Sequence, residues 1–128
     1  MRKHAGFTTI ELLIAVLFLV VAGTLFMFEK RDVDSISRDT QRKTAVNAMY
    51  YNLEEVYFPA NKSYPRVINS TVLKAMDPAL FKDPAGKAVG VSGSDYRYEP
   101  TGCDGDKCAG FTLRAHLEKE ADFVKENR

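Results

Sequence analysis

Residues 6–28 read GFTTIELLIAVLFLVVAGTLFMF, a stretch whose only charged side chain is Glu11. Its apolar part is roughly 20 residues long, which is enough for one bilayer crossing as an α-helix. Two basic residues, Arg2 and Lys3, precede it, and basic residues tend to stay on the cytoplasmic side of a membrane. We therefore expect residues 7–28 to cross a membrane once, with the N-terminus in the cytoplasm and the rest of the chain outside.

Glu11 is unusual at the start of such a helix. A carboxylate within the bilayer costs on the order of 2.5 kcal/mol or more unless it finds a partner. A cut between Gly6 and Phe7 would create an amine at Phe7, one helical turn from Glu11. Helices packed side by side would then let each Glu11 meet the amine of a neighbouring chain. We therefore predict that Glu11 is an assembly residue.

The hexapeptide GFTTIE at residues 6–11, followed by the apolar run, resembles the processing motif of type IV pilins and type II secretion pseudopilins. The resemblance implies that residues 1–6 are a leader, which a membrane aspartyl protease, the prepilin peptidase, removes by cutting after Gly6. It also implies that the same enzyme methylates the new terminal amine of Phe7, and that Glu11 helps subunits to dock.

The resemblance further implies a structural role in a pilus or pseudopilus. The partners would be other copies and other pilins in a homo- or hetero-oligomeric filament, an assembly platform and an external ATPase. The protein would lie in the inner membrane first, and then in an extracellular filament or a periplasmic pseudopilus. Val20 and Phe28 stand where major pilins carry helix-loosening Gly and Pro, which favours the alternative of a minor or tip subunit for adhesion or DNA uptake.

Two other interpretations of the apolar run stay open. It could be a secretory signal cut after Val20-Val21-Ala22, a small-residue site at the end of the apolar core. It could also be an uncut single-pass anchor that holds an exported binding domain. The mature N-terminus distinguishes the three interpretations, because it would be Phe7, Gly23 or Met1 respectively.

Residues 29–58 predict the amphipathic half of the same helix. Polarity changes abruptly at Glu29, and neither Pro nor Gly interrupts the chain from there to Phe58. Apolar residues recur at helical spacing, namely Val33, Ile36, Val46, Met49, Tyr50, Leu53, Val56 and Tyr57. The whole helix would be on the order of 75 Å long and would end at Pro59. The charged residues between these positions, Asp39, Arg42, Lys43, Glu54 and Glu55, are interpreted as a solvated face with weak ion pairs.

Residues 59–128 predict a small globular head with an antiparallel sheet. Strands are expected at 96–99 and 111–117, with a weaker candidate at 88–91. Short helices are expected from Asn69 or Ser70 to Met76, and from Asp77-Pro78 onward, while a loop spans 61–65 and Phe123 and Val124 add a last packed segment. The sheet should bury Tyr96, Tyr98, Phe111 and Leu113 against Met49 and Leu53. The predicted fold class is α+β, with a long N-terminal helix packed on the sheet.

Two features of the head could carry chemistry. Cys103 and Cys108 are spaced closely enough to close a disulfide turn in an oxidising compartment, although two free cytosolic thiols are the alternative. Asp95, Asp104 and Asp106 could bind Ca²⁺, as major pseudopilins resembling this chain do in their sheet loops. Asp-Gly is also ordinary turn chemistry, so both interpretations of these carboxylates stay open.

Composition and motifs argue against several functional classes. With 18 basic and 17 acidic residues the net charge is +1, so no direct nucleic-acid binding is predicted. The sequence has no phosphate-binding glycine loop, nucleophile elbow or paired Cys motifs. We therefore predict a structural subunit rather than an enzyme. His116 and Glu118 would share one strand face as a surface pair.

Overall fold

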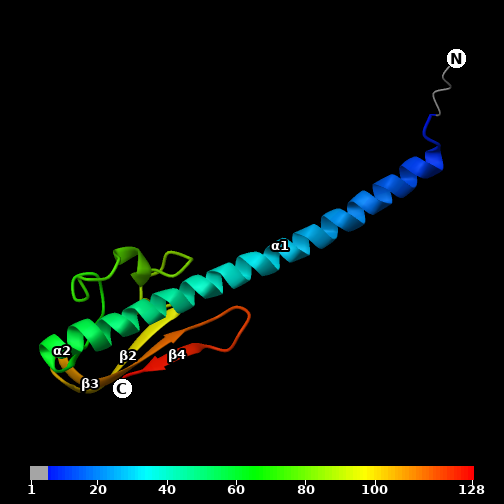
Figure 1. Ribbon diagram of the computed structural model, residues 1–128. Helices are drawn as coiled ribbons and strands as arrows, with labels where there is room; N and C mark the ends of the chain where they lie inside the picture. Colours follow the sequence, from blue (N-terminus) through cyan, green and yellow to red (C-terminus); the bar gives the residue numbers. More distant parts are fainter. Residues whose placement is uncertain (1–5) are drawn as a thin grey trace. The chain divides into compact units, whose positions relative to one another are not determined.

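The computed structural model describes residues 6–128, which combine a long N-terminal helix with a small antiparallel sheet (Figure 1). The chain divides into two compact units, the first ending at Asp34 and the second formed by Ser35–Arg128. Helix α1 (Thr9–Tyr51) contributes to both. The α+β fold class predicted from the sequence is confirmed. The proposed leader, residues 1–6, lies outside the described residues except for Gly6.

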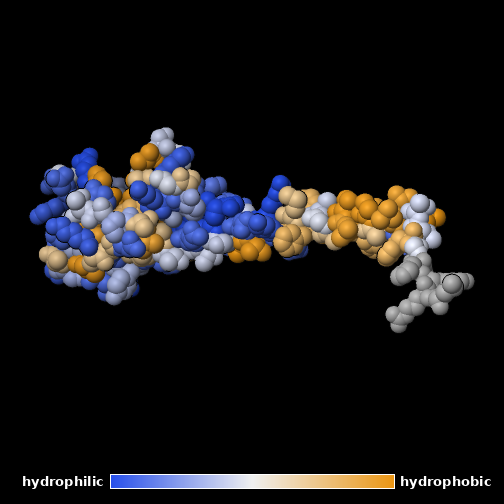
Figure 2. Space-filling model, turned by 90° about the horizontal axis from the view of Figure 1, so that it is seen from above, coloured by the Kyte–Doolittle hydropathy of each residue, from blue (hydrophilic) through white to orange (hydrophobic). Residues whose placement is uncertain are grey.

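The first unit consists of the N-terminal part of α1 and the residues just before it. Every residue from 6 to 34 is exposed, and the surface of this segment is mostly apolar (Figure 2). The helix is long and apolar enough to cross a membrane. The sequence-based expectation of a membrane-length helix is therefore confirmed.

The helical path continues past Pro59, where the sequence predicted its end. After α1 comes a π-helical segment, η1 (Asn52–Tyr57), and then α2 (Phe58–Asn61). Pro59 lies in the first turn of α2, where the missing N–H and the fixed φ of proline are tolerated. The helix ends at Lys62, whose left-handed φ of 55° directs the chain toward the sheet.

The sheet has four antiparallel strands: β1 (Tyr64–Pro65), β2 (Tyr96–Asp104), β3 (Lys107–Ala115) and β4 (Phe123–Glu126). Strand β3 is central and pairs with the other three. The two predicted strands form a longer hairpin than expected, and the 61–65 loop and the C-terminal segment each contribute a strand. The weak candidate at 88–91 provides only an isolated bridge, Lys82 to Ala88.

The core lies between the sheet and the C-terminal part of the helix, as predicted. Met49 and Leu53 are buried in one cluster with Tyr96, Phe111 and Leu113, and Tyr98 packs against it half-buried. The helix buries a narrower apolar stripe than expected, because Val33, Ile36 and Val56 are exposed.

The segment between β1 and β2 is mostly turns. The helix predicted from Asn69 to Met76 is wrong: the Asn69 side chain accepts hydrogen bonds from the backbone of Thr71 and Val72, but the turn does not propagate. The second predicted helix is present as the 3₁₀ helix η2 (Pro78–Phe81), with Asp77 as its cap.

Candidate functional site

The processing motif lies at the start of α1. Gly6, Phe7 and Thr8 precede the helix, and Phe7 is 84% exposed. Thr8 forms a capping box with Glu11: the Thr8 N–H donates to Glu11 Oε2 at 3.1 Å, and the Glu11 N–H donates to Thr8 Oγ1 at 3.3 Å. This reciprocal pair satisfies two helix-terminal donors. The carboxylate also lies where the helix dipole stabilises negative charge.

The capping box gives Glu11 a local role that the sequence reasoning missed. The signal was present, because Thr-x-x-Glu before an apolar run is a helix-start pattern. The carboxylate accepts through Oε2 from the Thr8 N–H and from the Thr8 hydroxyl, the latter at 3.3 Å. Glu11 is therefore an N-terminal helix residue whose charge is not neutralised by a cation within the described residues.

A continuous apolar surface follows Glu11. Large apolar side chains around the whole helix are exposed, including Ile10, Leu12, Leu13, Ile14, Val16, Leu17, Phe18, Leu19, Val20, Val21, Leu25, Phe26, Met27 and Phe28. An apolar surface of this extent is typical of contact with lipid or with other protein chains. The only acidic residue among positions 6–28 stands at the start of this surface.

The second cluster is a buried ion network in the head, on residues that the sequence reasoning placed in solvent. Asp39 and Arg42 are only 3% and 6% exposed. The Arg42 guanidinium donates to Asp39 Oδ1 at 2.8 Å, to Asp95 Oδ2 at 2.9 Å and to Glu118 Oε1 at 2.9 Å. Arg38 makes a bidentate contact with Glu118: its Nε donates to Oε1 at 2.7 Å and its Nη2 donates to Oε2 at 2.6 Å. The network therefore joins α1 to the open end of the β2–β3 hairpin, where Asp95 precedes β2 and Glu118 follows β3.

Asp39 also receives backbone hydrogen bonds that hold its charge. Its oxygens accept from the N–H groups of Glu118 and Lys119 at 2.9 to 3.1 Å. Burial alone would raise the pKa of Asp39, but these N–H groups and Arg42 outweigh it and hold the pKa below its ordinary value. Hydrogen bonds from Arg38 and then Arg42 lower the pKa of Glu118 to about 2.

The interpretation of a solvated face was wrong for Asp39 and Arg42, and for Glu54 too. The buried positions of α1 are Asp39, Arg42, Ala45, Val46 and Met49, so the core-facing stripe continues through two charged residues. Glu54 is buried and accepts from the Tyr64 hydroxyl at 3.0 Å and from the Arg128 N–H at 3.2 Å. Desolvation, and then this carboxylate, raise the pKa of Tyr64 to about 12.

The remaining residues of that charged set behave as predicted. Lys43 pairs with Glu120 at 2.7 Å, and Glu55 pairs with Arg128 at 3.1 Å. Both pairs are solvent-accessible, so each is expected to contribute little to stability.

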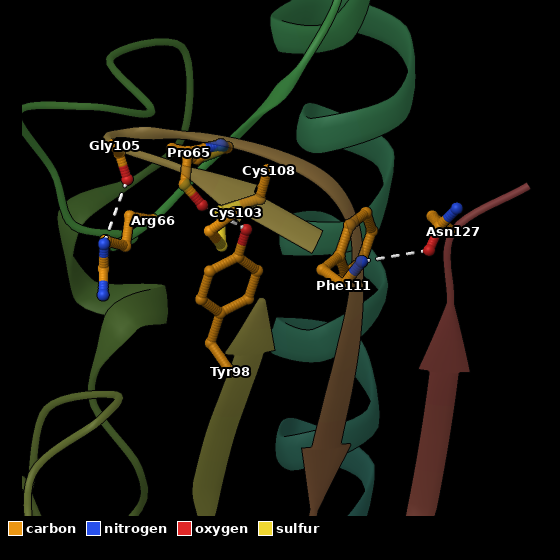
Figure 3. Close-up of a disulfide and its surroundings, with 8 residues drawn as sticks. All are labelled: Pro65, Arg66, Tyr98, Cys103, Gly105, Cys108, Phe111 and Asn127. Carbon is orange, nitrogen blue, oxygen red and sulfur yellow. Dashed lines mark hydrogen bonds between the residues drawn. A yellow bond between two sulfur atoms is a disulfide. The ribbon is translucent and has the colours of Figure 1, made fainter. Parts of the chain in front are cut away.

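The predicted disulfide is present at the end of the β2–β3 hairpin (Figure 3). Cys103 and Cys108 are directly opposite in the ladder and are joined by a bond of 2.03 Å. Gly105 in the turn has a φ of 60°, which favours glycine, and its carbonyl accepts from Arg66 at 3.1 Å. The Tyr98 hydroxyl donates to the Pro65 carbonyl at 2.6 Å and ties β2 to β1 (Figure 3).

The structure does not bring the candidate calcium ligands together. Asp104 ends β2 whereas Asp95 immediately precedes it, and eight residue steps of strand span roughly 26 Å. Asp95 is engaged by Arg42. Within residues 6–128 no group of three or more His, Cys, Asp or Glu side chains could hold a metal ion. Asp104, the last residue of β2, and Asp106 flank Gly105 at the turn of the hairpin, which is the alternative that the sequence left open.

His116 and Glu118 do not form the predicted surface pair. His116 Nδ1 lies 2.9 Å from Asp122 Oδ1. Glu118 follows the end of β3 and turns toward Arg38 and Arg42 instead. Alternation along a strand does not extend past Ala115, where the strand ends.

No family model, curated protein or solved structure matches this chain. The candidate site is therefore defined by its own residues: an exposed Gly6-Phe7 bond, a capped helix start at Thr8, and Glu11 ahead of an exposed apolar helix. The head adds a disulfide and a buried ion network.

Proposed function

We propose that this protein is a structural subunit of a type IV pilus or a type II secretion pseudopilus. It is processed by a prepilin peptidase after Gly6, methylated at Phe7 and polymerised through its N-terminal helix. The observation that carries the proposal is the position of Glu11, a lone carboxylate one turn from the Gly6-Phe7 bond at the start of an exposed apolar stretch of helix.

The geometry around Gly6 supports processing at this bond. Residues 6–8 lie outside the helix, and proteases bind substrates as non-helical backbone whose amides are free to pair with the cleft. A Cβ placed on Gly6 would meet no atom within 4 Å. Glycine at this position is therefore not required by the packing of residues 6–128, and in this proposal its role is recognition by the peptidase.

The environment of Glu11 supports docking between subunits. The Thr8 contacts donate hydrogen bonds but bring no positive charge, so in a bilayer residues 6–128 would offer the carboxylate no counter-ion. Cleavage would supply an amine at Phe7. In a side-by-side assembly, the amine of one helix and the carboxylate of the next would neutralise each other within an apolar surface.

The direction of insertion is part of the same proposal. The N-terminus faces the cytoplasm, and the head is exported before the subunit moves from the inner membrane into the filament. The Cys103–Cys108 disulfide supports an exported head, because structural disulfides persist in oxidising compartments.

Mass spectrometry of the protein purified from its native host tests the processing step. We expect an N-terminus at Phe7 with a 14 Da methyl increment. Gly6→Val should leave the precursor uncut, whereas the matched variant Gly23→Ala should be processed normally, since a Cβ at either glycine meets no atom within 4 Å. An N-terminus at Met1 would indicate an uncut anchor, and one at Gly23 a secretory signal; either result refutes the proposal.

Glu11→Gln tests docking separately from capping. Glutamine can replace glutamate in a capping box, so helix start and membrane insertion should be retained. Removal of the charge should lower incorporation into sheared filaments by at least about tenfold, equivalent to about 1.4 kcal/mol. Thr8→Ala is the matched control, because it removes the cap and keeps the charge. Equal filament yield from Glu11→Gln and wild type would show that the charge has no docking role.

A further inference from the structure

Two arginines face each other on the sheet of the head without a counter-ion. Arg97 in β2 and Arg114 in β3 are direct cross-strand partners. The neighbour of Arg114 on the other side, in β4, is Val124. Like charges placed directly opposite in a ladder are destabilising, so this arrangement would be costly if nothing balanced it.

Neither guanidinium has a hydrogen bond or ion pair within residues 6–128. The Nε atom of Arg114 is buried and unpaired. By contrast, Arg42 contacts three carboxylates. An unpaired buried donor on a charged group carries a larger penalty than a neutral one.

Both arginines line one pocket of about 350 Å³, together with Ser94, Asp95 and Asp122. The two carboxylates in the wall are already committed elsewhere. Asp95 Oδ2 accepts from Arg42 at 2.9 Å, and Asp122 Oδ1 contacts His116 at 2.9 Å. The pocket therefore presents two guanidinium groups without a direct partner among residues 6–128 and a hydroxyl, beside two carboxylates whose hydrogen bonds lie elsewhere.

The nearest other acids on this face do not neutralise the pair. Glu99 and Glu126 are both cross-strand partners of Thr112, which places each of them diagonal to Arg114. Diagonal neighbours are about 7–8 Å apart, and neither glutamate forms an ion pair with an arginine of this pocket in the described part of the chain.

We propose that this pocket binds a phosphate monoester or inorganic phosphate. A phosphate monoester carries about −1.5 to −2 charges at neutral pH, which matches two guanidinium groups, whereas a carboxylate would balance only one. Guanidinium groups also suit phosphate oxygens because their planar N–H groups can donate in pairs. The site lies on the head alone and does not depend on filament assembly.

Calorimetric titration of the full chain in phosphate-free micelles tests the site. Inorganic phosphate should bind in a one-to-one ratio at fixed ionic strength. Arg97→Gln and Arg114→Gln should each weaken it by at least about tenfold, since a charge-assisted hydrogen bond is lost. Arg66→Gln removes the same charge from another surface of the head, where Arg66 contacts only a backbone carbonyl, and should change affinity less than twofold.

Other anions identify the source of the phosphate. Acetate and dimethyl phosphate carry one charge and should bind at least about tenfold more weakly than inorganic phosphate. Equal binding of glycerol phosphate would indicate a terminal phosphate on a larger molecule, and its exclusion would indicate the free ion. Absence of saturable phosphate binding at millimolar concentrations, or equal loss in all three arginine variants, would overturn the proposal.

Discussion

The two units of this chain differ in how their charged side chains are paired. The N-terminal unit has one acid, Glu11, at the start of its apolar surface, and its contacts are uncharged hydrogen-bond donors from Thr8. The head buries Asp39 and Arg42 and surrounds them with opposite charges and backbone N–H groups. The buried charges of α1 in the head are therefore paired by the head's own residues, whereas the charge of Glu11 at the helix start could be paired by another molecule.

Asp39→Ala should have the largest effect, because it removes the centre of the head's ion network. The substitution leaves the buried Arg42 guanidinium and the partly buried N–H groups of Glu118 and Lys119 without this acceptor. Breaking a buried pair from one side typically costs about 3–5 kcal/mol of unfolding free energy. Urea unfolding of the full chain in micelles, followed by near-ultraviolet dichroism of the head's tyrosines, measures it.

Lys43→Ala is the control for that experiment. It breaks an exposed pair on the same stretch of helix, Lys43–Glu120, and should cost at most about 1 kcal/mol. If the two variants were equally stable, the contrast between buried and exposed charges within the head would not hold.

Removing the disulfide should have an intermediate effect. In the double variant Cys103→Ser/Cys108→Ser, the unfolded chain regains the entropy of a loop closed across a sequence separation of 5. Loop-closure entropy for so short a loop corresponds to about 2 kcal/mol of unfolding free energy. The urea midpoint should therefore fall, with the same loss in reduced wild type. A midpoint unchanged by reduction would mean that the strand ladder alone determines hairpin stability.

Acidification should produce the smallest effect, since partly exposed Glu118 is screened by solvent. The folded-state pKa values of Asp39 and Glu118 lie below their ordinary values, that of Glu118 at about 2. The folded state therefore binds fewer protons, and the stabilisation is present above the unfolded pKa and is lost as pH falls from about 4.5 toward 2.

Urea midpoints between pH 7 and pH 2 measure this loss. Glu118→Gln should be less stable at neutral pH and should show a flatter acid limb than wild type. Because every residue from 6 to 34 is exposed, helical dichroism of the micelle-bound segment should not follow the same curve. An acid limb identical in wild type and variant would contradict the assigned role of Glu118.

Much of the architecture could be predicted from local patterns. The membrane-length helix follows from composition, the hairpin from strand alternation around a Gly/Asp turn, and the disulfide from the spacing of Cys103 and Cys108. Errors arose where a local signal allowed more than one structure. Pro59 did not end the helix, because it lies in the first turn of α2, and a capping Asn69 did not start one.

The residues of the candidate site were also predicted only in part. Glu11 was identified from its unusual chemistry, since an acid before an apolar run is visible in the sequence. Asp39, Arg42 and Glu54 were missed, because a charged residue at helical spacing usually faces water. The Arg97–Arg114 pair was missed as well, because the register that makes them neighbours depends on the hairpin turn.

The sequence by itself determined that this chain has an apolar helix of membrane length with one acid at its start, because hydrophobicity and segment length are properties of consecutive residues. Only the tertiary structure decided which charges are buried, paired or left without a counter-ion. The physical reason is that the energy of a charge depends on its surroundings, and around Arg42 those come from residues as distant in sequence as Glu118.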